Sequence, residues 1–323
     1  MDLTTHYLGL ELRNPIVASA GPLARGVAGV RRLADAGVGA IVLPSIFEEQ
    51  LDRNSPPTGG QPRDPHDHLD VITLSAGAVD VPVIASLNGS TTGGWTAYAT
   101  AMEEAGAAAI ELNLYLPQAD PLTPGHEIEQ QHVEVLETVK AAVGIPVAVK
   151  ITPYLSSPGE LALRLDRLGA DGLVLFNRFM QMGIDPEALQ VSADFELSRP
   201  ADAAFARAWI AQLRGRVSAS LAASTGVESA ADVAAYLLAG ADVVMTTSAL
   251  LRHGPEHAEK LLYGLTGWMR RKGFEDLTAV RGLLAEPLEQ QVTARHSGGR
   301  NREPYLDALE HATSTYGLES GSA

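Results

Sequence analysis

The stretch AAIELNLYLPQ, residues 108–118, is the segment around which we interpret this 323-residue chain. Isoleucine and leucine alternate along it with Glu111, Asn113 and Tyr115, and alternation with a period of two is typical of a β-strand. In a barrel of parallel strands, one face of each strand points at the barrel axis. We therefore expect a strand broken by Pro117, with Asn113 on the inward face near its carboxyl end, where barrel enzymes place their chemistry.

Outward from this stretch, apolar segments alternate with helical patterns along the whole chain. Strands are predicted at residues 16–21, 40–45, 81–88, 108–114, 145–152, 172–178, 217–225 and 243–248. Helices are predicted at residues 26–37, 92–105, 126–143, 159–168, 201–213, 229–239 and 256–271. Eight such strands alternating with helices are typical of a (β/α)8 TIM barrel. A doubly wound open sheet is the alternative, but no G-x-G-x-x-G follows the first strand.

The remaining segments fit one domain that spans residues 1–323. YLGLEL, residues 7–12, predicts a small N-terminal hairpin strand that covers one end of the core. Residues 48–68 are rich in proline, glycine and charge, which predicts a surface loop that could serve as a lid. Residues 286–323 are predicted to be a C-terminal helical extension of the same domain, with a flexible SGGR segment at 297–300 and a helix at 303–315.

The composition excludes several classes of function for this chain. With 46% hydrophobic and 20% charged residues, the chain is globular. The absence of cysteine excludes disulfides, iron–sulfur ligation and a thiol nucleophile, and we expect no metal site. The formal charge of −15 disfavours nucleic acid and anionic membranes as partners. No run reaches the roughly 18–20 apolar residues of a membrane span, and no secretory signal is recognised, so we expect a cytoplasmic protein.

Polar residues stand at the ends of most predicted strands. They are Ser19, Ser45, Asn88, Asn113, Lys150, Asn177, Ser224, Thr225, Gly226, Thr247 and Ser248. A single serine or threonine there is commonly an ordinary helix cap. Lys150 differs, because it follows the buried apolar run IPVAV and a buried ammonium is costly unless an anion or cofactor faces it. The alternative is a lysine that snorkels to the rim.

The loops after the last two strands carry a second signal. LAASTGVESAADV and VVMTTSALL each place small residues just before a helix, the first helix starting near Glu228. In barrels, these two loops commonly bind phosphate through backbone amides and a helix N-terminus, and Gly226 permits close backbone approach. Ordinary capping is the alternative.

These motifs together resemble the dihydroorotate dehydrogenase family of flavin barrels, more closely its class 1, which lacks an N-terminal membrane-binding extension. The resemblance runs from LGLELRNPIVASAG through ELNLYLPQ, VAVKITPY and LVLFNR to TGVESAADVAAYLLAGADVVMTTSALL. It implies FMN as cofactor and places Lys150 near the pyrimidine edge of the flavin, as a catalytic residue. The other FMN contacts that it implies are Ala20, Gly21, Ser45, Asn88, Asn113, Asn177, Ser224, Thr225, Gly226, Thr247 and Ser248.

The substrate side departs from the family pattern. Leu116 fills the position of the family's Cys or Ser base and cannot accept a proton, and Gln118 replaces an asparagine that binds substrate. Pro44 stands where the family has a lysine, and Arg178 where it usually has serine or threonine. The chain thus resembles a subgroup called dihydroorotate dehydrogenase-like proteins. Its expected substrate contacts are Asn113, Gln118, Asn177 and Arg178.

Three functional hypotheses remain open. The first is an FMN-dependent oxidoreductase that acts on a small anionic substrate other than dihydroorotate. The second is a genuine dihydroorotate dehydrogenase of pyrimidine (UMP) biosynthesis that uses another base, such as Ser45, Tyr115 or a loop residue. The third is a non-catalytic flavoprotein or an electron-transfer subunit of a partner enzyme. Class 1 relatives imply a homodimer, with or without a redox partner protein.

Overall fold

The computed structural model describes residues 1–51, 65–89, 95–114, 122–178, 181–194, 196–285 and 311. The chain divides into two compact units, Met1–Ala285 and Glu286–Ala323. The predicted C-terminal extension and its helix at 303–315 fall in the second unit, which lies outside the described residues except for His311, so both stay predictions.

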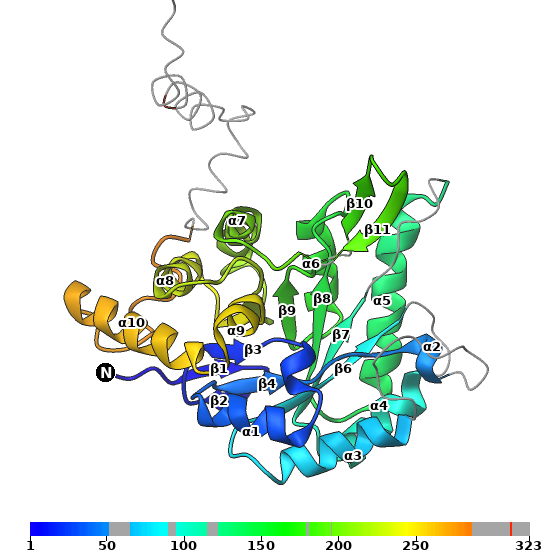
Figure 1. Ribbon diagram of the computed structural model, residues 1–323, viewed down its shortest axis with the longest axis horizontal. Coiled ribbons are helices and arrows are strands. Elements are labelled where there is room, and N and C mark those ends of the chain that lie inside the picture. Colours follow the sequence, from blue (N-terminus) through cyan, green and yellow to red (C-terminus); the bar gives the residue numbers. More distant parts are fainter. Residues whose placement is uncertain are drawn as a thin grey trace, which may run out of the picture. The chain divides into compact units, whose positions relative to one another are not determined.

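The first unit is built on a closed barrel of eight parallel strands (Figure 1). The strands are β3 (Ile16–Ala18), β4 (Ala40–Val42), β6 (Val83–Asn88), β7 (Ala109–Asn113), β8 (Val147–Ile151), β9 (Gly172–Leu175), β12 (Ser220–Ala223) and β13 (Val243–Thr246). The barrel closes because β13 pairs with β3 and β4 pairs with β6. A short strand, β5 (Ile46–Phe47), pairs with the last residues of β6. The predicted TIM barrel is confirmed.

Helices surround the barrel. They are α1 (Val27–Asp35), α3 (Pro65–Ala76), α4 (Trp95–Glu104), α5 (Gly125–Ala142), α6 (Pro158–Arg167), α7 (Ala203–Leu213), α8 (Ala230–Ala239), α9 (Ser248–His253) and α10 (His257–Lys272). Helix α1 shows why they form: Val30 and Leu33, one turn apart, bury one face, and Gly37 at φ 89° terminates the helix. Each helix predicted between residues 26 and 271 is present within a few residues of its predicted bounds.

The segment 48–68 was expected to be a loop, and its described ends are helical instead. Helix α2 (Glu48–Leu51) follows β5, and α3 begins at Pro65. Proline is favourable at the first helical position because its missing N–H has no intrahelical partner there. The apolar side of α3 is anchored by Ile72, which is fully buried, and the polar composition of its first turn concealed this from a sequence-based prediction. Residues 52–64 lie outside the described part of the chain.

The amino end of the barrel is closed by an N-terminal hairpin, as predicted. Strands β1 (Thr5–Tyr7) and β2 (Leu10–Leu12) pair antiparallel. Tyr7, Leu8 and Leu12 are at most 2% exposed and pack against the inward residues of the barrel strands. A Cβ at Gly172 would lie 2.4 Å from Leu8 Cδ2, so a glycine on β9 lets the hairpin approach. Burying each of the two leucine side chains contributes about 1.5–3 kcal/mol.

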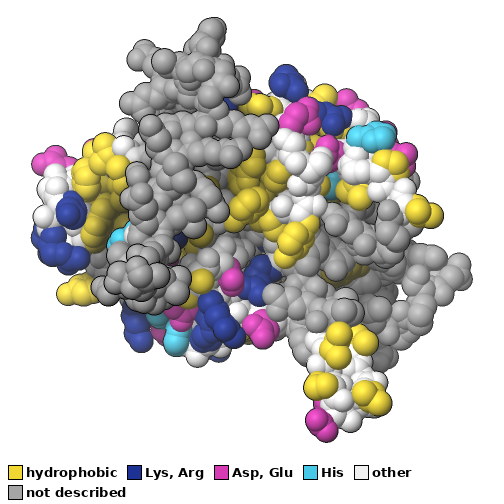
Figure 2. Space-filling view, turned by 90° about the horizontal axis from the view of Figure 1, so that it is seen from above, with side chains coloured by type: hydrophobic (Ala, Val, Ile, Leu, Met, Phe, Trp, Pro, Cys, Tyr) yellow, Lys and Arg dark blue, Asp and Glu magenta, His cyan; other side chains and the backbone are white. Residues whose placement is uncertain are grey.

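A second hairpin lies between β9 and α7, where the sequence indicated only a long excursion. Strands β10 (Gln181–Asp185) and β11 (Gln190–Asp194) pair antiparallel and project from the body (Figures 1 and 2). Ile184 and Val191 form a cross-strand pair that is 66% and 70% exposed, so the apolar residues that favour these strands do not enter the core. Within the described ranges, no helix combines the length and apolar character that a membrane crossing requires.

Candidate active site

Strand register brings several predicted residues to one end of the barrel. Asn88 on β6 pairs with Asn113 on β7, and Asn113 pairs with Lys150 on β8. Because neighbouring residues in register face the same side, these three side chains lie side by side on the inward face. Asn88 and Lys150 are buried, at 5% and 6% exposure. The inward position that the sequence predicted for Asn113 is therefore what the register produces.

Amide and hydroxyl groups at this end form a connected chain. Asn177 Nδ2 donates to Asn113 Oδ1 over 2.5 Å, and Asn113 Nδ2 donates to Ser45 Oγ over 3.4 Å. Ser45 Oγ in turn lies 2.8 Å from Ser86 Oγ. Each asparagine is thus held in one orientation by its neighbour. Ser86, fully buried on β6, was not among the predicted site residues.

Lys150 forms a buried ion pair that the sequence analysis did not anticipate. Its Nζ lies 3.5 Å from Glu111 Oε1 and donates to Ser19 Oγ over 3.2 Å. The side chains of Lys150 and Glu111 are only 7% and 1% exposed. The signal was available, because Glu111 stands two residues before Asn113 and a period of two puts both on the inward face. The snorkelling alternative for Lys150 does not fit this geometry.

Ser19 connects the lysine to the loop after β13. Its backbone oxygen accepts a hydrogen bond from Thr247 Oγ1 over 2.8 Å, while its hydroxyl accepts one from Lys150. The nearby Ala20 and Gly21 follow β3, and a Cβ at Gly21 would lie 2.5 Å from Thr247 Cγ2. A side chain at position 21 would therefore push against the start of α9.

The turn after β12 has the backbone form that a close ligand approach requires. Thr225 and Gly226 have φ values of 82° and 72°, in the left-handed region. A Cβ at Gly226 would lie 2.8 Å from Ala203, so the close approach to α7 also requires glycine there. Tyr236 Oη lies 2.7 Å from Thr225 O and 3.1 Å from Ser224 O, which holds the turn against α8. Burial raises the pKa of Tyr236 well above its usual range, so it stays a neutral donor.

Among the hydroxyl groups predicted to contact phosphate, those of the two threonines already donate their protons within the protein. Thr225 Oγ1 donates to Phe176 O, and Thr247 Oγ1 to Ser19 O. Ser248 Oγ accepts from the amide and the hydroxyl of Ser198. Since a hydroxyl carries one proton, neither threonine can donate to a ligand without losing its present partner.

The helix N-terminus expected near Glu228 is also engaged by the protein itself. Helix α8 begins at Ala230 with Ser229 as its N-cap, and Asp232 Oδ2 accepts from the amides of Glu228 and Ser229. This capping box places a carboxylate where a phosphate was expected. The loop after β13 leads instead into the short helix α9, and the N-terminus of a short extra helix is the usual phosphate site of such barrels.

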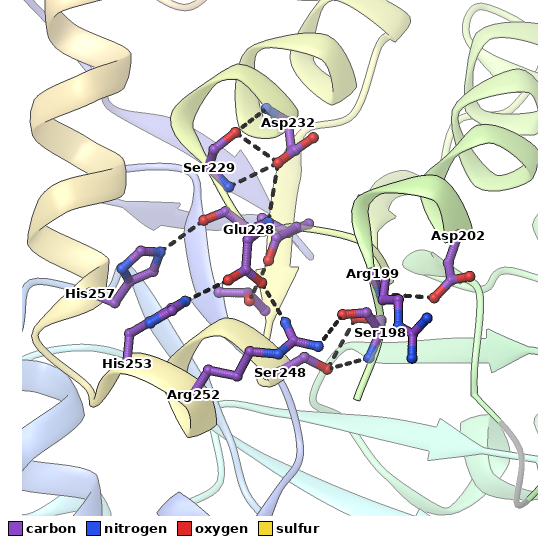
Figure 3. A network of polar contacts seen from close by, with 12 residues as sticks. Ser198, Arg199, Asp202, Glu228, Ser229, Asp232, Ser248, Arg252, His253 and His257 are labelled. Carbon is purple, nitrogen blue, oxygen red and sulfur yellow. Dashed lines mark hydrogen bonds and ion pairs between the residues drawn. The ribbon is translucent and has the colours of Figure 1, made fainter. Parts of the chain in front are cut away.

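A network of polar contacts connects the loop after β12 with helix α9, which follows β13 (Figure 3). The Glu228 carboxylate lies 2.5 Å from both Arg252 and His253 of α9, and Arg252 Nη2 donates to Ser198 O over 2.6 Å. His257 Nε2 lies 2.8 Å from Glu228 O. The loops after β12 and β13 are therefore joined by ion pairs rather than by packing alone.

A pocket of about 190 Å³ opens beside Asn177, at one end of the hydrogen-bonded series Asn177–Asn113–Ser45. It is lined by Pro153, Tyr154, Phe176, Asn177, Arg178, Asp202, Phe205, Ala206 and Thr225. Arg178 Nη1 lies 2.8 Å from Asp202 Oδ2, so its charge is balanced within the pocket wall. The rings of Phe176 and Phe205 pack with centroids 5.4 Å apart. The pocket thus brings together Asn177, Arg178 and Thr225, three residues predicted from the sequence.

The loop after β7 carries the residues that are expected to decide the substrate chemistry, and these residues stay predictions. Tyr115, Leu116 and Gln118 lie outside the described residues. Between β4 and β5, Pro44 presents its backbone oxygen to His68 Nε2 at 3.2 Å. Burial lowers the pKa of His68, so this imidazole is neutral near pH 7 and brings no charge to replace the family's lysine.

This protein has a closed (β/α)8 barrel with buried polar groups at the carboxyl ends of its strands. These features define the class of barrel enzymes. Sequence comparison then gives the family. The family model described as "Dihydroorotate dehydrogenase" matches residues 62–269, well over half of the chain. This chain belongs to the dihydroorotate dehydrogenase family, which confirms the resemblance drawn from its motifs.

Relatives match almost from end to end. "Dihydroorotate dehydrogenase B (NAD(+)), catalytic subunit" of Methanocella arvoryzae is 28% identical over 317 residues, covering 90% of this chain and 100% of the relative. "Dihydroorotate dehydrogenase A (fumarate)" of Limosilactobacillus reuteri is 29% identical over 305 residues, covering 85% of this chain and 96% of the relative. The protein is accordingly an oxidoreductase of the dihydroorotate dehydrogenase type, acting on CH–CH groups, and its family is one of flavoproteins.

Proposed function

We propose that this protein uses FMN to oxidise or reduce a small anionic substrate by hydride transfer, and that the substrate is not dihydroorotate. The observation that carries the proposal is Lys150, a buried ammonium at the carboxyl end of β8 inside a barrel of this family. An inward cation there favours a cofactor that gains negative charge when it is reduced, as flavin does.

The residues present fit FMN. The left-handed turn at Thr225 and Gly226 and the start of α9 provide backbone groups for a terminal phosphate. The hydroxyls of Thr225 and Thr247 serve better to hold these loops, because their protons are already donated. The absence of a dinucleotide fingerprint favours FMN over FAD.

The chain's own side chains would orient the ring and the substrate. When bound, FMN supplies the acceptor or donor of the hydride. Asn113 and Asn177, fixed by their mutual hydrogen bond, offer amide groups to the ring edge and to the substrate. Lys150 supplies positive charge at the pyrimidine edge, while Arg178 in the adjoining pocket is a candidate contact for an anionic group, together with Gln118. The proton acceptor of the reaction is not assigned.

Dihydroorotate oxidation in pyrimidine biosynthesis is the second candidate, favoured by the names of the relatives. It requires a base other than Leu116, and Ser45, whose hydroxyl accepts from Asn113 Nδ2, is a candidate. Because the relative from Methanocella arvoryzae is named a catalytic subunit, we include a redox partner protein in the proposal. We further propose that the protein is a cytoplasmic homodimer.

The deciding experiment is reduction of the purified FMN-loaded protein by a panel of small donors. Bleaching of the flavin absorbance by a small acid other than dihydroorotate is the expected result. Rapid bleaching by dihydroorotate would favour the second candidate. A flavin that only a partner protein reduces would identify an electron-transfer subunit.

A further inference from the structure

Glu111 is a charged side chain placed deep inside the barrel. It is almost completely buried and lies on the inward face of β7, two residues before Asn113. Its Oε1 faces Lys150, while its Oε2 is buried without a hydrogen-bond partner among the described residues. Below it lies the apolar hairpin floor, where Tyr7 is buried and its hydroxyl also lacks a partner in the described part of the chain.

The position of Lys150 follows from this carboxylate. In the register of the sheet, Lys150 pairs with Asn113 and Glu111 pairs with Ala148. The ammonium therefore reaches diagonally back, from its own level to that of Glu111, rather than straight across to Asn113. The ion pair with Glu111 holds the ammonium of Lys150 closer to the amino end of the barrel. The negative charge of Glu111 also offsets the positive charge that Lys150 presents at the carboxyl end of the barrel.

A contribution to folding stability does not explain why Lys150 and Glu111 are buried together. A carboxylate and an ammonium buried together lose their hydration, and apolar side chains of similar volume commonly serve stability as well or better. The unpartnered Oε2 makes the arrangement less favourable still. The pair is better explained by its electrostatic effect on what lies above Lys150.

We propose that Glu111 is a positioning residue that sets the place and the net charge of Lys150, and thereby the reduction potential of the bound flavin. This inference rests on the proposed FMN function. With Glu111 present, its negative charge offsets part of the positive charge of Lys150. Without its charge, Lys150 would present a full positive charge to the mouth and would favour the more negative, reduced form of the cofactor.

The test is a double-mutant cycle on the FMN-loaded protein. Glu111→Gln keeps the size of the side chain and removes its charge, and it should shift the two-electron midpoint potential positively by about 30 mV or more, a tenfold change in the reduction equilibrium. In a Lys150→Met background, the same substitution should shift it much less, because the effect acts through the lysine. Glu129→Gln is the matched control: Glu129 is buried on α5, outside the barrel, with its Oε1 bonded to Ser156.

The outcomes separate the two proposals. Wild-type protein that takes up no FMN overturns the proposed function and this inference with it. Bound FMN with an unchanged potential in Glu111→Gln, or with equal shifts in both backgrounds, overturns only the role of Glu111. If Glu111→Gln does not fold, Glu111→Asp retains the charge but shortens the reach to Lys150. A positive shift relative to wild type supports the inference, and no shift overturns it.

Discussion

Asn177 on the segment after β9 donates its side-chain N–H to the side-chain oxygen of Asn113 on β7 over 2.5 Å, although 64 residues separate them in the sequence. Strand β8, which carries Lys150, lies between them in the sheet. The two asparagines thus join across the strand of the buried lysine, and the mouth of the barrel presents amides of defined orientation around one cation.

We expect FMN to be the bound cofactor. The purified protein should be yellow and bind one FMN per chain, and it should not bind FAD, because the loops after β12 and β13 suit a terminal phosphate. The absorbance spectrum and the mass of the extracted cofactor check this. Colourless protein that does not take up added FMN would contradict it.

Lys150→Ala should lower flavin reactivity more than FMN affinity. The positive charge of the lysine acts mainly on the reduced state, so its loss costs the reaction rather than the binding. The measurements are the midpoint potential, which should become more negative, and the FMN dissociation constant. An unchanged potential would refute this role for Lys150.

Wild-type protein should be a poor dihydroorotate dehydrogenase, and Leu116→Cys alone should not rescue it. A general base is commonly worth 10²–10⁴-fold in rate, and Leu116 cannot act as one. The charge lost at Pro44 adds about 1.5–3 kcal/mol of missing contact to an anionic ring. Arg178, bonded to Asp202, occupies space where the family keeps a small hydroxyl residue.

Dihydroorotate oxidation with fumarate, quinone and dye acceptors checks this expectation in both the wild type and the Leu116→Cys variant. Turnover of about 1 s⁻¹ or more by the wild type is an ordinary enzyme rate and would show that another residue serves as base. Rescue by Leu116→Cys alone would show instead that the pocket retains the shape for dihydroorotate.

Tyr236→Phe should weaken FMN binding and cost about 0.5–1.5 kcal/mol of stability, because it removes the hydrogen bond that holds Thr225 O in the left-handed turn. Tyr263→Phe is the matched control, since Tyr263 is 84% exposed on α10. Chemical denaturation and FMN titration of both variants measure the effect. Equal behaviour of the two variants would argue against a role for Tyr236 in shaping the turn.

Stability should fall as the pH drops from about 7 toward 5, in part because of His132. Burial lowers the folded-state pKa of His132 below the usual 6.5, against smaller opposing effects of its hydrogen bond to Ile128 O and of Glu129. Because the unfolded chain then binds more protons, the stabilisation is fully present above the unfolded pKa and is lost as the pH falls through it toward the folded pKa.

His132→Gln should therefore reduce the difference in unfolding free energy between pH 7 and pH 5. The control substitution is His6→Gln, which removes a histidine from the exposed surface rather than from the buried face of α5. Urea denaturation at both pH values supplies the free energies. A pH dependence that His132→Gln leaves unaltered would place its origin elsewhere.

The sequence by itself determined the barrel, the closing hairpin and the inward positions of Asn113 and Lys150. These follow from local rules: strands alternate with a period of two, helices bury one face, and glycines such as Gly37 terminate them. The family could be recognised for the same reason, because its motifs stand at strand ends whose order the chain preserves.

Only the tertiary structure decided which polar groups meet. The contact of Lys150 with Glu111 depends on the register between two strands, and the engagement of Thr225 and Thr247 depends on backbone oxygens far away in the sequence. The helical start of α3 likewise followed from the burial of Ile72 rather than from composition. Local preference sets where a strand ends, but burial and hydrogen-bond satisfaction, which depend on the whole fold, decide the partner of each buried polar group.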